Sequence, residues 1–286
     1  MNRFFLFLPL LMACLSLSAQ TTEMEQDMFE TMREDDKAVV VAVHKDAISG
    51  IGQRSIDRLT LRLHELYPNY DYREACTTPG AMGQASDPDK LFSQLQKDGY
   101  THVLIQPSGI TNDLDMQYLR QMVETAKGKF KQMRLGEPLL SDLADYQEVA
   151  NMAISTFSIP KQVNVLVCNG TDKEADASYI MLDYMLRDQT QDWFLATIVG
   201  HPSLDHLIKQ LKKQKLKKVH LVPFNAEANK MIGGEWTKKL QQAGYKVTAE
   251  PTTLMEQAGI IQLFEQHVRH AEQFRRLTAT EQKLLP

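Results

Sequence analysis

Two successive series of short apolar runs, each followed by an amphipathic segment, constrain the fold of this chain more than any other feature. In the first series, the continuous β-branched run at residues 38–43 predicts a strand that is buried on both faces. Further strands are predicted at residues 70–74, 102–106 and 133–135, with helices around residues 56–66, 91–95 and 115–126. Strands that alternate with helices are typical of a parallel sheet.

The second series repeats this order. It predicts strands at residues 163–167, 193–198, 219–222 and 245–248, and helices at residues 175–186, 204–211 and 236–243. A closing helix follows, with Ile260, Ile261, Phe264 and Val268 on one face. We therefore expect an α/β fold of two tandem parallel-sheet domains, at residues 37–150 and 151–286, with a cleft between them. A length of 286 residues suits two domains.

The N-terminus has the pattern of a secretory signal, with Arg3 before a short apolar run at residues 4–12. Two cleavage sites compete. Residues 11–14 resemble a lipoprotein box with Cys14 as the lipidated residue, whereas Ala19 would suit an ordinary signal peptidase. We assign residues 1–19 to the signal and the acidic residues 20–36 to a tether. The expected product is exported, either as an outer-membrane lipoprotein held only by its lipid or as a periplasmic protein.

Charge, cysteine content and motifs exclude several other classes. A net charge of -4 gives no general attraction to phosphate backbones, so nucleic acid is not an expected partner. Cys76 and Cys168 are too few for a disulfide framework. The sequence also lacks a Gly-rich phosphate loop, a serine nucleophile elbow, a paired-cysteine zinc site and an HExxH helix.

Candidate site residues are those that follow the strands, because parallel sheets bind ligands beyond their carboxyl ends. His44 follows the first strand, where it either enters the cleft or decorates the surface. Cys168 follows the first strand of the second series, either as a soft thiolate ligand or as a small buried hydrophobe. His201 lies between Gly200 and Pro202 at a strand-to-helix turn, as a ligand or as a space-filling residue.

Several stretches in the same order and spacing resemble the anaerobic sirohydrochlorin cobalt chelatases, which share the two-domain fold of ferrochelatase. They are residues 38–43, 99–107 (GYTHVLIQP), 135–140 (LGEPLL), 175–186, 200–211 (GHPSLDHLIKQL) and 217–223 (KKVHLVP). The resemblance implies a metal inserted into a tetrapyrrole held between the domains. It also implies imidazole and carboxylate ligands at strand ends of the second domain.

The chain departs from this family pattern at the expected ligands. Asn169 stands where a ligand histidine is expected, and an amide is a poor metal ligand beside imidazole. Val199 replaces a glutamate. The third ligand should come from a loop at residues 225–235, which contains no histidine and whose ionisable group nearest that position is Glu227. We therefore expect a degenerate metal site.

Export and ligand loss together favour an exported chelatase-like protein that binds a tetrapyrrole, with haem as the expected ligand, for iron or porphyrin acquisition. It resembles the chelatase-like haem-uptake lipoproteins of anaerobic Gram-negative bacteria, with an outer-membrane haem receptor as a further partner. We expect the tetrapyrrole near His201, His44, Cys168, Asn169 and Glu227, with His201 and then His44 as iron ligands. Two alternatives stay open: an active cobaltochelatase or ferrochelatase that uses His44, His201 and Glu227, and a scaffold that binds a partner protein.

Overall fold

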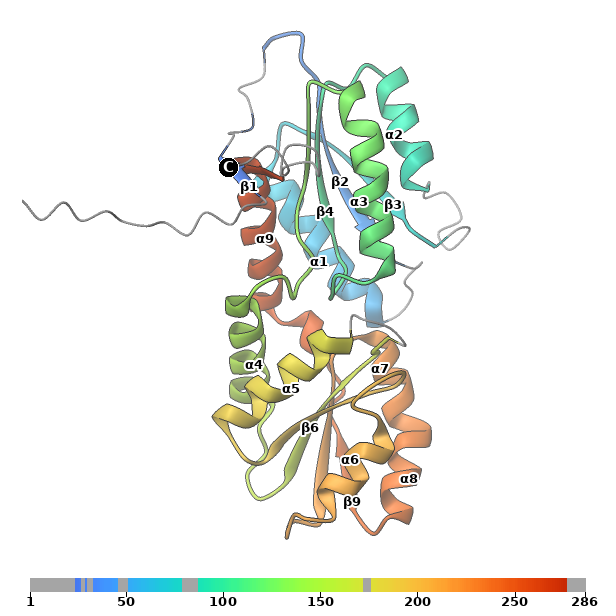
Figure 1. Cartoon of the computed structure of the whole chain (residues 1–286), viewed down its shortest axis with the longest axis vertical. Helices are drawn as coiled ribbons and strands as arrows, with labels where there is room; N and C mark the ends of the chain where they lie inside the picture. Colours follow the sequence, from blue (N-terminus) through green and yellow to red (C-terminus); the bar gives the residue numbers. More distant parts are fainter. Residues whose placement is uncertain are drawn as a thin grey trace, which may run out of the picture.

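The computed structural model describes residues 24–26, 29, 33–45, 51–78, 87–171 and 176–276. The predicted signal segment and the lipidation site Cys14 lie outside the described residues. Two halves are stacked end to end, each built on its own parallel sheet (Figure 1). The predicted α/β fold with two tandem parallel sheets is therefore confirmed.

The first half is a four-stranded sheet with the order β3-β2-β4-β5. Its strands are β2 (Ala38–His44), β3 (Asp71–Cys76), β4 (His102–Pro107) and β5 (Gln132–Leu135). They are joined by α1 (Ile51–Leu66), α2 (Pro88–Lys97), α3 (Leu114–Ala126) and the short 3₁₀ turn η1 (Lys127–Lys129). Asp113 caps α3 by accepting a hydrogen bond from the Met116 amide, which satisfies a free donor of the first turn.

The second half repeats this arrangement with the order β7-β6-β8-β9. Its strands are β6 (Val163–Cys168), β7 (Trp193–Thr197), β8 (Lys218–Pro223) and β9 (Lys246–Ala249). Its helices are α5 (Asp176–Gln189), α6 (Leu204–Leu211), α7 (Ala226–Met231), the π-helical turn η2 (Ile232–Trp236) and α8 (Thr237–Gln242). The loop predicted at residues 225–235 is wrong, because Asn225 caps α7 and the chain stays helical up to α8.

Both sheets have the same topology. In each, the first strand in sequence has the second strand on one side and the third on the other. The order in which strands are added to the sheet therefore reverses between β2 and β4 in the first half, and between β6 and β8 in the second. A crevice for ligands forms at such a switch point, outside the carboxyl ends of the strands.

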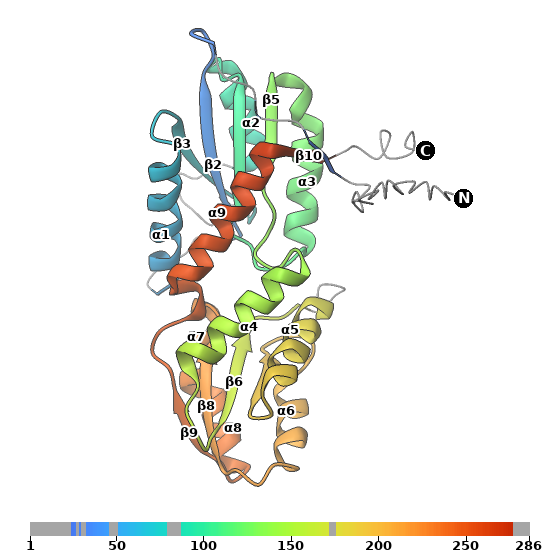
Figure 2. The same ribbon diagram turned by 90° about the vertical axis from the view of Figure 1, so that its left-hand side faces the viewer.

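Two helices connect the halves. Helix α4 (Leu143–Phe157), which the sequence patterns did not predict, begins at a capping box between Asp142 and Asp145 and packs against α5. Helix α9 (Ala258–Gln273) follows the 3₁₀ turn η3 (Leu254–Glu256) and returns to the first half, where it packs against α1, β4 and β5 (Figures 1 and 2). The division at residue 150 stays a prediction, since these helices link the two sheets.

One apolar core runs through both halves. Val40 and Ala42 on one face of β2 share it with Leu166 and Cys168 on β6, and α1, α4, α5 and α9 cover it. Two further clusters fill the opposite faces, beneath α2 and α3 in the first half and beneath α6, α7 and α8 in the second. A shared core fixes the relative positions of the two switch points.

The segment predicted as a tether contains a strand. β1 (Met24–Gln26) pairs antiparallel with β10 (Phe274–Arg276), which directly follows α9. The Phe29 amide donates to the Glu272 carbonyl, and its ring meets His102 edge-on. Backbone pairing with a distant segment gave no periodic signal in the sequence. No helix in the described part of the chain is both long and apolar enough to cross a membrane.

Candidate functional site

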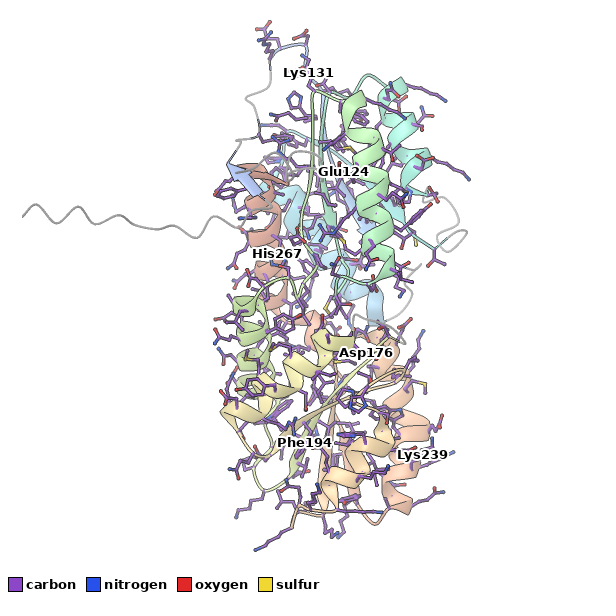
Figure 3. All side chains as sticks on the ribbon, viewed as in Figure 1. Glu124, Lys131, Asp176, Phe194, Lys239 and His267 are labelled. Carbon is purple, nitrogen blue, oxygen red and sulfur yellow. The ribbon has the colours of Figure 1, made fainter. Side chains whose placement is uncertain are left out.

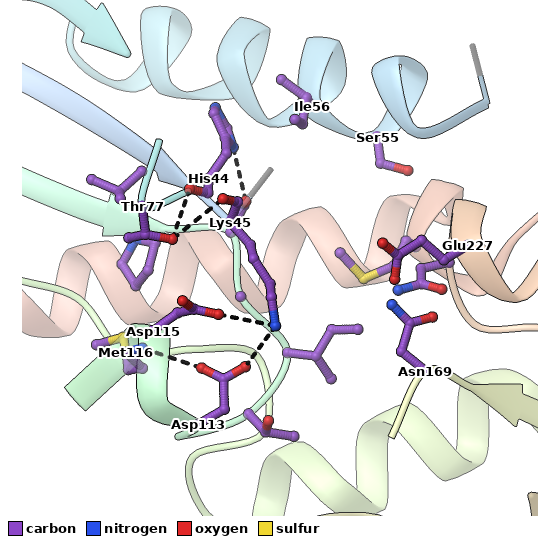
Figure 4. Close-up of a pocket in the computed structure, with 18 of the residues that line it drawn as sticks. His44, Lys45, Ser55, Ile56, Thr77, Asp113, Asp115, Met116, Asn169 and Glu227 are labelled. Carbon is purple, nitrogen blue, oxygen red and sulfur yellow. Dashed lines mark hydrogen bonds and ion pairs between the residues drawn. The ribbon is translucent and has the colours of Figure 1, made fainter. Parts of the chain in front are cut away.

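The candidate site is a cavity of about 220 Å³ at the junction of the two halves. It lies beyond the carboxyl ends of β2 and β4 on one side and of β6 and β8 on the other (Figure 4). Apolar side chains from α1, η3 and α9 form part of its wall, including Ile56, Met255 and Phe264. The two switch points of the fold thus open into one shared space.

His44 is the imidazole of this cavity. It is only 1% exposed, and its Nδ1 lies 2.8 Å from the Ser108 hydroxyl oxygen at the end of β4. Its Nε2 is buried and has no hydrogen-bond partner among the described residues. Burial lowers the pKa of His44 below its ordinary value of 6.5, and the negative charge of Glu74 partly opposes this effect. His44 is therefore a neutral imidazole at neutral pH, and one of its two nitrogens is left without a hydrogen-bond partner in the described structure.

Lys45 places a cation beside two carboxylates in the same cavity. Its Nζ lies 2.9 Å from Asp115 Oδ2 and 3.7 Å from Asp113 Oδ2 (Figure 4). Lys45 follows β2, whereas both aspartates lie at the start of α3. These ion pairs are partly solvated, so a ligand carboxylate can compete for Lys45 at small cost.

The second half contributes amides and one carboxylate. Asn169 follows β6, and its Oδ1 is buried without a hydrogen-bond partner in the described structure. Glu227, from the first turn of α7, faces the same part of the cavity (Figure 4). Gly170 has a φ of 73°, and a Cβ there would lie 1.9 Å from the Val199 carbonyl oxygen. Only glycine fits this close approach.

The predicted site residues fall into two groups. His44, Asn169 and Glu227 line the cavity together. His201 and Val199 are exposed and do not belong to its lining. Cys168 is fully buried in the shared core, where burial raises the pKa of its thiol. Because a protonated thiol is a poor ligand, the geometry supports the reading of Cys168 as a small hydrophobe.

His201 is kept outside the cavity by the turn that precedes it. Gly200 has a φ of 80° and lies against Thr171 and Asp176. The His201 amide then donates to Asp176 Oδ2 at 3.0 Å. Asp176 is the first residue of α5 (Figure 3). These contacts fix the turn with the imidazole of His201 against that of His206.

Ser108, Lys45, Asp113 and Asp115 were not among the predicted site residues. Ser108 directly follows β4, which was predicted as a strand at residues 102–106. Asp113 and Asp115 follow the same strand within eight residues, so their position after a predicted strand was the available signal. Their proximity to Lys45 depends on the pairing of β2 with β4, which the sequence does not specify.

Metal-binding groups do not converge in the described part of the molecule. No three side chains of His, Cys, Asp or Glu there are arranged to hold an ion. Inside the cavity, Asp113 and Asp115 are engaged by Lys45, while His44 lies in the first half and Glu227 in the second. The cavity therefore offers scattered polar groups around an apolar wall, an arrangement that suits an organic ligand.

Comparison with known proteins shows which family the chain matches. The model of the cobalt chelatase (CbiK) family matches residues 37–273. The sirohydrochlorin cobaltochelatase of Salmonella typhimurium is 27% identical over 194 residues, which cover 64% of this chain and 74% of the relative. The sirohydrochlorin cobaltochelatase CbiKC of Nitratidesulfovibrio vulgaris is 23% identical over 240 residues, which cover 77% of this chain and 85% of the relative.

Solved structures agree on the fold. SirB from Bacillus subtilis, solved with Fe³⁺, has a TM-score of 0.61 at 13% identity and covers 83% of this chain and 96% of its own. CbiX, the terminal enzyme of siroheme biosynthesis in denitrifying bacteria, has a TM-score of 0.53 at 18% identity, with coverage of 82% and 99%. Since the family model spans most of the chain, this protein belongs to the cobalt chelatase (CbiK) family.

Proposed function

We propose that this protein binds a tetrapyrrole in the cavity between its halves, with His44 facing the bound macrocycle. The observation that carries this proposal is the cavity itself, which joins both switch points of a cobalt chelatase family fold. The named relatives are sirohydrochlorin cobaltochelatases, so a macrocycle is the ligand class that family membership favours. The apolar wall suits the flat face of such a ring.

The size and charge of the cavity favour one kind of macrocycle. About 220 Å³ is less than the roughly 300–1,000 Å³ of typical ligand pockets, so the cavity would have to widen to admit a macrocycle. Asp113, Asp115 and Glu227 outnumber Lys45 and Lys230 along the lining. Sirohydrochlorin carries eight carboxylates and haem carries two, so electrostatic repulsion is weaker for haem. We therefore favour haem as the ligand.

Binding without rapid metal insertion is the activity we propose. Asn169 and Val199 stand where the family resemblance places a histidine and a glutamate, and neither residue binds divalent ions well. His44 can still occupy an axial position on a bound iron, because imidazole is a common haem ligand. Family membership favours metal insertion as the second candidate, with His44 and Glu227 as the available groups.

We further propose that the protein is exported and serves iron or porphyrin acquisition, anchored through Cys14 and delivering its ligand to an outer-membrane receptor. The signal-like N-terminus supports this proposal. Cys14→Ser should release the protein from the membrane fraction, since the lipid would be its anchor. Membrane association that is unchanged by this substitution would contradict a lipid anchor at Cys14.

A titration separates the candidate functions. Haem and a metal-free porphyrin are added to the mature protein, the Soret band is recorded, and Co²⁺ or Fe²⁺ insertion into sirohydrochlorin is then assayed. We expect saturable haem binding and insertion that is absent or very slow. Fast insertion would favour the chelatase, and the lack of both binding and insertion would favour a scaffold that binds a partner protein.

A further inference from the structure

The end of the second half that lies farthest from the cavity is strongly basic. It is formed by the segments that lead into the four strands of the second sheet, at residues 158–162, 188–192, 212–218 and 243–246 (Figures 1 and 2). These segments contain seven exposed lysines and only two acidic residues, although the whole chain has a net charge of -4. The lysines, which we call the basic end, are Lys161, Lys212, Lys213, Lys215, Lys217, Lys218 and Lys246.

Strand pairing brings lysines from three of these segments side by side. Lys218 pairs with Lys246 across β8 and β9. Lys161 and Lys217 each lie two residues before the first pair of β6 with β8. Since neighbouring strands are about 4.8 Å apart, the backbones of these lysines lie within roughly 10 Å of one another along this edge of the sheet. The positive charge therefore comes from the topology as well as from the run at residues 212–218.

The backbone of the basic end is held in place, but its charges are not paired. The Lys246 amide donates to the Lys217 carbonyl at 2.8 Å, and the Ile159 amide donates to Asn164 Oδ1 at 2.9 Å. None of the seven lysines forms an ion pair within the described part of the chain. Their mutual repulsion is therefore relieved only by ions in solution or by an anionic partner.

Lys161 has a backbone conformation that lysine rarely adopts. Its φ is 63°, and among the described residues no other residue except glycine has a positive φ. A side chain in this left-handed region is strained, whereas glycine is not. The exposed Lys161 side chain makes no hydrogen bond or ion pair in the described structure that would compensate for the strain. A strained residue of this kind is expected where its side chain contacts a ligand outside the chain.

We propose that the basic end docks on the anionic surface of a phospholipid bilayer. It contains no arginine. Arginine has a planar fork that recognises a single phosphate in a bidentate manner, whereas lysine is a hydrated point charge that suits a diffuse anionic surface. Each lysine near such a surface strengthens binding about fivefold. This attraction is weakened by salt, unlike a lipid anchor, so the two modes of membrane association can be told apart.

Docking through the basic end leaves the cavity accessible. None of the seven lysines lines the cavity, which lies at the opposite end of the second sheet, beyond the carboxyl ends of its strands. A bilayer at the basic end therefore does not cover it. The proposal does not depend on which ligand the cavity binds.

The test compares vesicles of neutral and anionic composition. Full-length Cys14→Ser protein, which cannot be lipidated at that residue, is sedimented with vesicles of phosphatidylcholine alone or with about one third phosphatidylglycerol. We expect partitioning onto the anionic vesicles to be stronger by about tenfold or more, and to weaken as the salt concentration rises. Any apolar contribution of the N-terminal segment is common to both compositions.

Two triple variants of this protein with the same change in net charge show whether the basic end is responsible. The test variant neutralises three of its lysines, by Lys212→Gln, Lys213→Gln and Lys215→Gln. The matched control neutralises three exposed lysines of the first half, by Lys90→Gln, Lys97→Gln and Lys129→Gln. We expect partitioning onto anionic vesicles to fall about tenfold or more in the test variant and less than about twofold in the control.

Lys161→Gly separates backbone strain from binding. Glycine adopts the observed φ without strain, so the temperature of thermal unfolding should rise, while partitioning onto anionic vesicles should fall about fivefold. The proposal is overturned if Lys161→Gly partitions like the wild type, if the two triple variants behave alike, or if both vesicle compositions bind equally. It is also overturned if double-stranded DNA at the same phosphate concentration displaces the protein from the vesicles, since nucleic acid would then be the preferred partner. Haem titration uses no vesicles, so these outcomes are distinct from a failure of tetrapyrrole binding.

Discussion

The two halves share one topology but present different chemistry at the same structural position. Strand pairing aligns Val43 with Pro107 in the first sheet and Val167 with Pro223 in the second. The next residue is His44 in the first half and Cys168 in the second. His44 has a hydroxyl neighbour and a buried ring nitrogen without a hydrogen-bond partner among the described residues, whereas Cys168 is buried in the apolar core.

The residues that follow extend this difference. After β2 and β4 come Lys45 and Ser108, which are polar, while after β6 and β8 come Asn169 and Phe224. Phe224 is fully buried and fills the place that Ser108 has in the first half. A repeated fold can therefore keep its crevice while moving reactive groups from one half to the other. In this chain the imidazole at the junction belongs to the first half.

The largest expected effect concerns backbone geometry in the second half. Gly170→Ala should lower the free energy of unfolding by about 3 kcal/mol, because a methyl group would collide with the Val199 carbonyl at a positive φ. Gly109→Ala, in the first half, is the control and should change it by less than about 0.5 kcal/mol, since nothing lies within 4 Å of its Cβ position. Urea unfolding measures both, and equal effects would contradict the close packing.

A second prediction concerns the sealed thiol. Cys168→Ser should cost about 1–2 kcal/mol of unfolding free energy, because a hydroxyl is buried in an apolar core. Cys76→Ser at the end of β3 should cost less, since Cys76 Sγ already donates to the Lys45 carbonyl at 3.0 Å. If Cys168→Ser lowered the unfolding free energy less than Cys76→Ser, the apolar surroundings assigned to Cys168 at the end of β6 would be contradicted.

The pH dependence of stability should report on the first half. The pKa of His44 is lowered by burial, so the unfolded chain binds a proton more readily than the folded one. Stability from this group is complete above pH 6.5 and is lost as the pH falls below that value, by at most about 1.4 kcal/mol per pH unit. Thermal melts from pH 7.5 to 5 should be flatter for His44→Gln. If the wild type and His44→Gln had parallel curves of stability against pH, another group would cause the pH dependence. His220 is one such group, because burial also lowers its pKa.

The smallest effect is expected at Lys45. Lys45→Met removes its ion pairs with Asp113 and Asp115 and should change unfolding free energy by less than about 1 kcal/mol, because the lysine side chain is 57% exposed. Haem affinity should fall more clearly, since the variant loses a cation that can pair with a propionate. Denaturant unfolding and haem titration of the same samples give the two changes in free energy. A larger change in unfolding free energy than in binding free energy would contradict the role of Lys45 in haem binding.

The strands could be predicted because each is a short apolar run, and most predicted bounds lie within one or two residues of the observed ones. Helix α4 was missed although it has buried residues such as Val149 and Ala153. Residues 225–235 were assigned to a loop on the strength of the family resemblance, but they include the two glycines of η2, Gly233 and Gly234. A π-helical turn accommodates both glycines. Local patterns do not contain this information.

The site was only partly predictable. His44 was found because it ends a strand, and the register of that strand with β4 brings it to Ser108. The location of His201 depends on the positive φ of Gly200 and on a hydrogen bond to Asp176, 25 residues earlier in the chain. Such long-range contacts determine whether a strand-end residue enters the cavity, and a single sequence does not reveal them.

Haem titration of three proteins distinguishes His44 from His201 as the ligand of the iron. Wild type, His44→Ala and His201→Ala are titrated with haem while the Soret band is recorded. We expect His44→Ala to shift the Soret maximum and to weaken affinity, because an imidazole that would ligate the iron is lost, and we expect His201→Ala to behave like wild type. A shift in His201→Ala together with an unchanged spectrum in His44→Ala would contradict the assignment of the ligand to the first half.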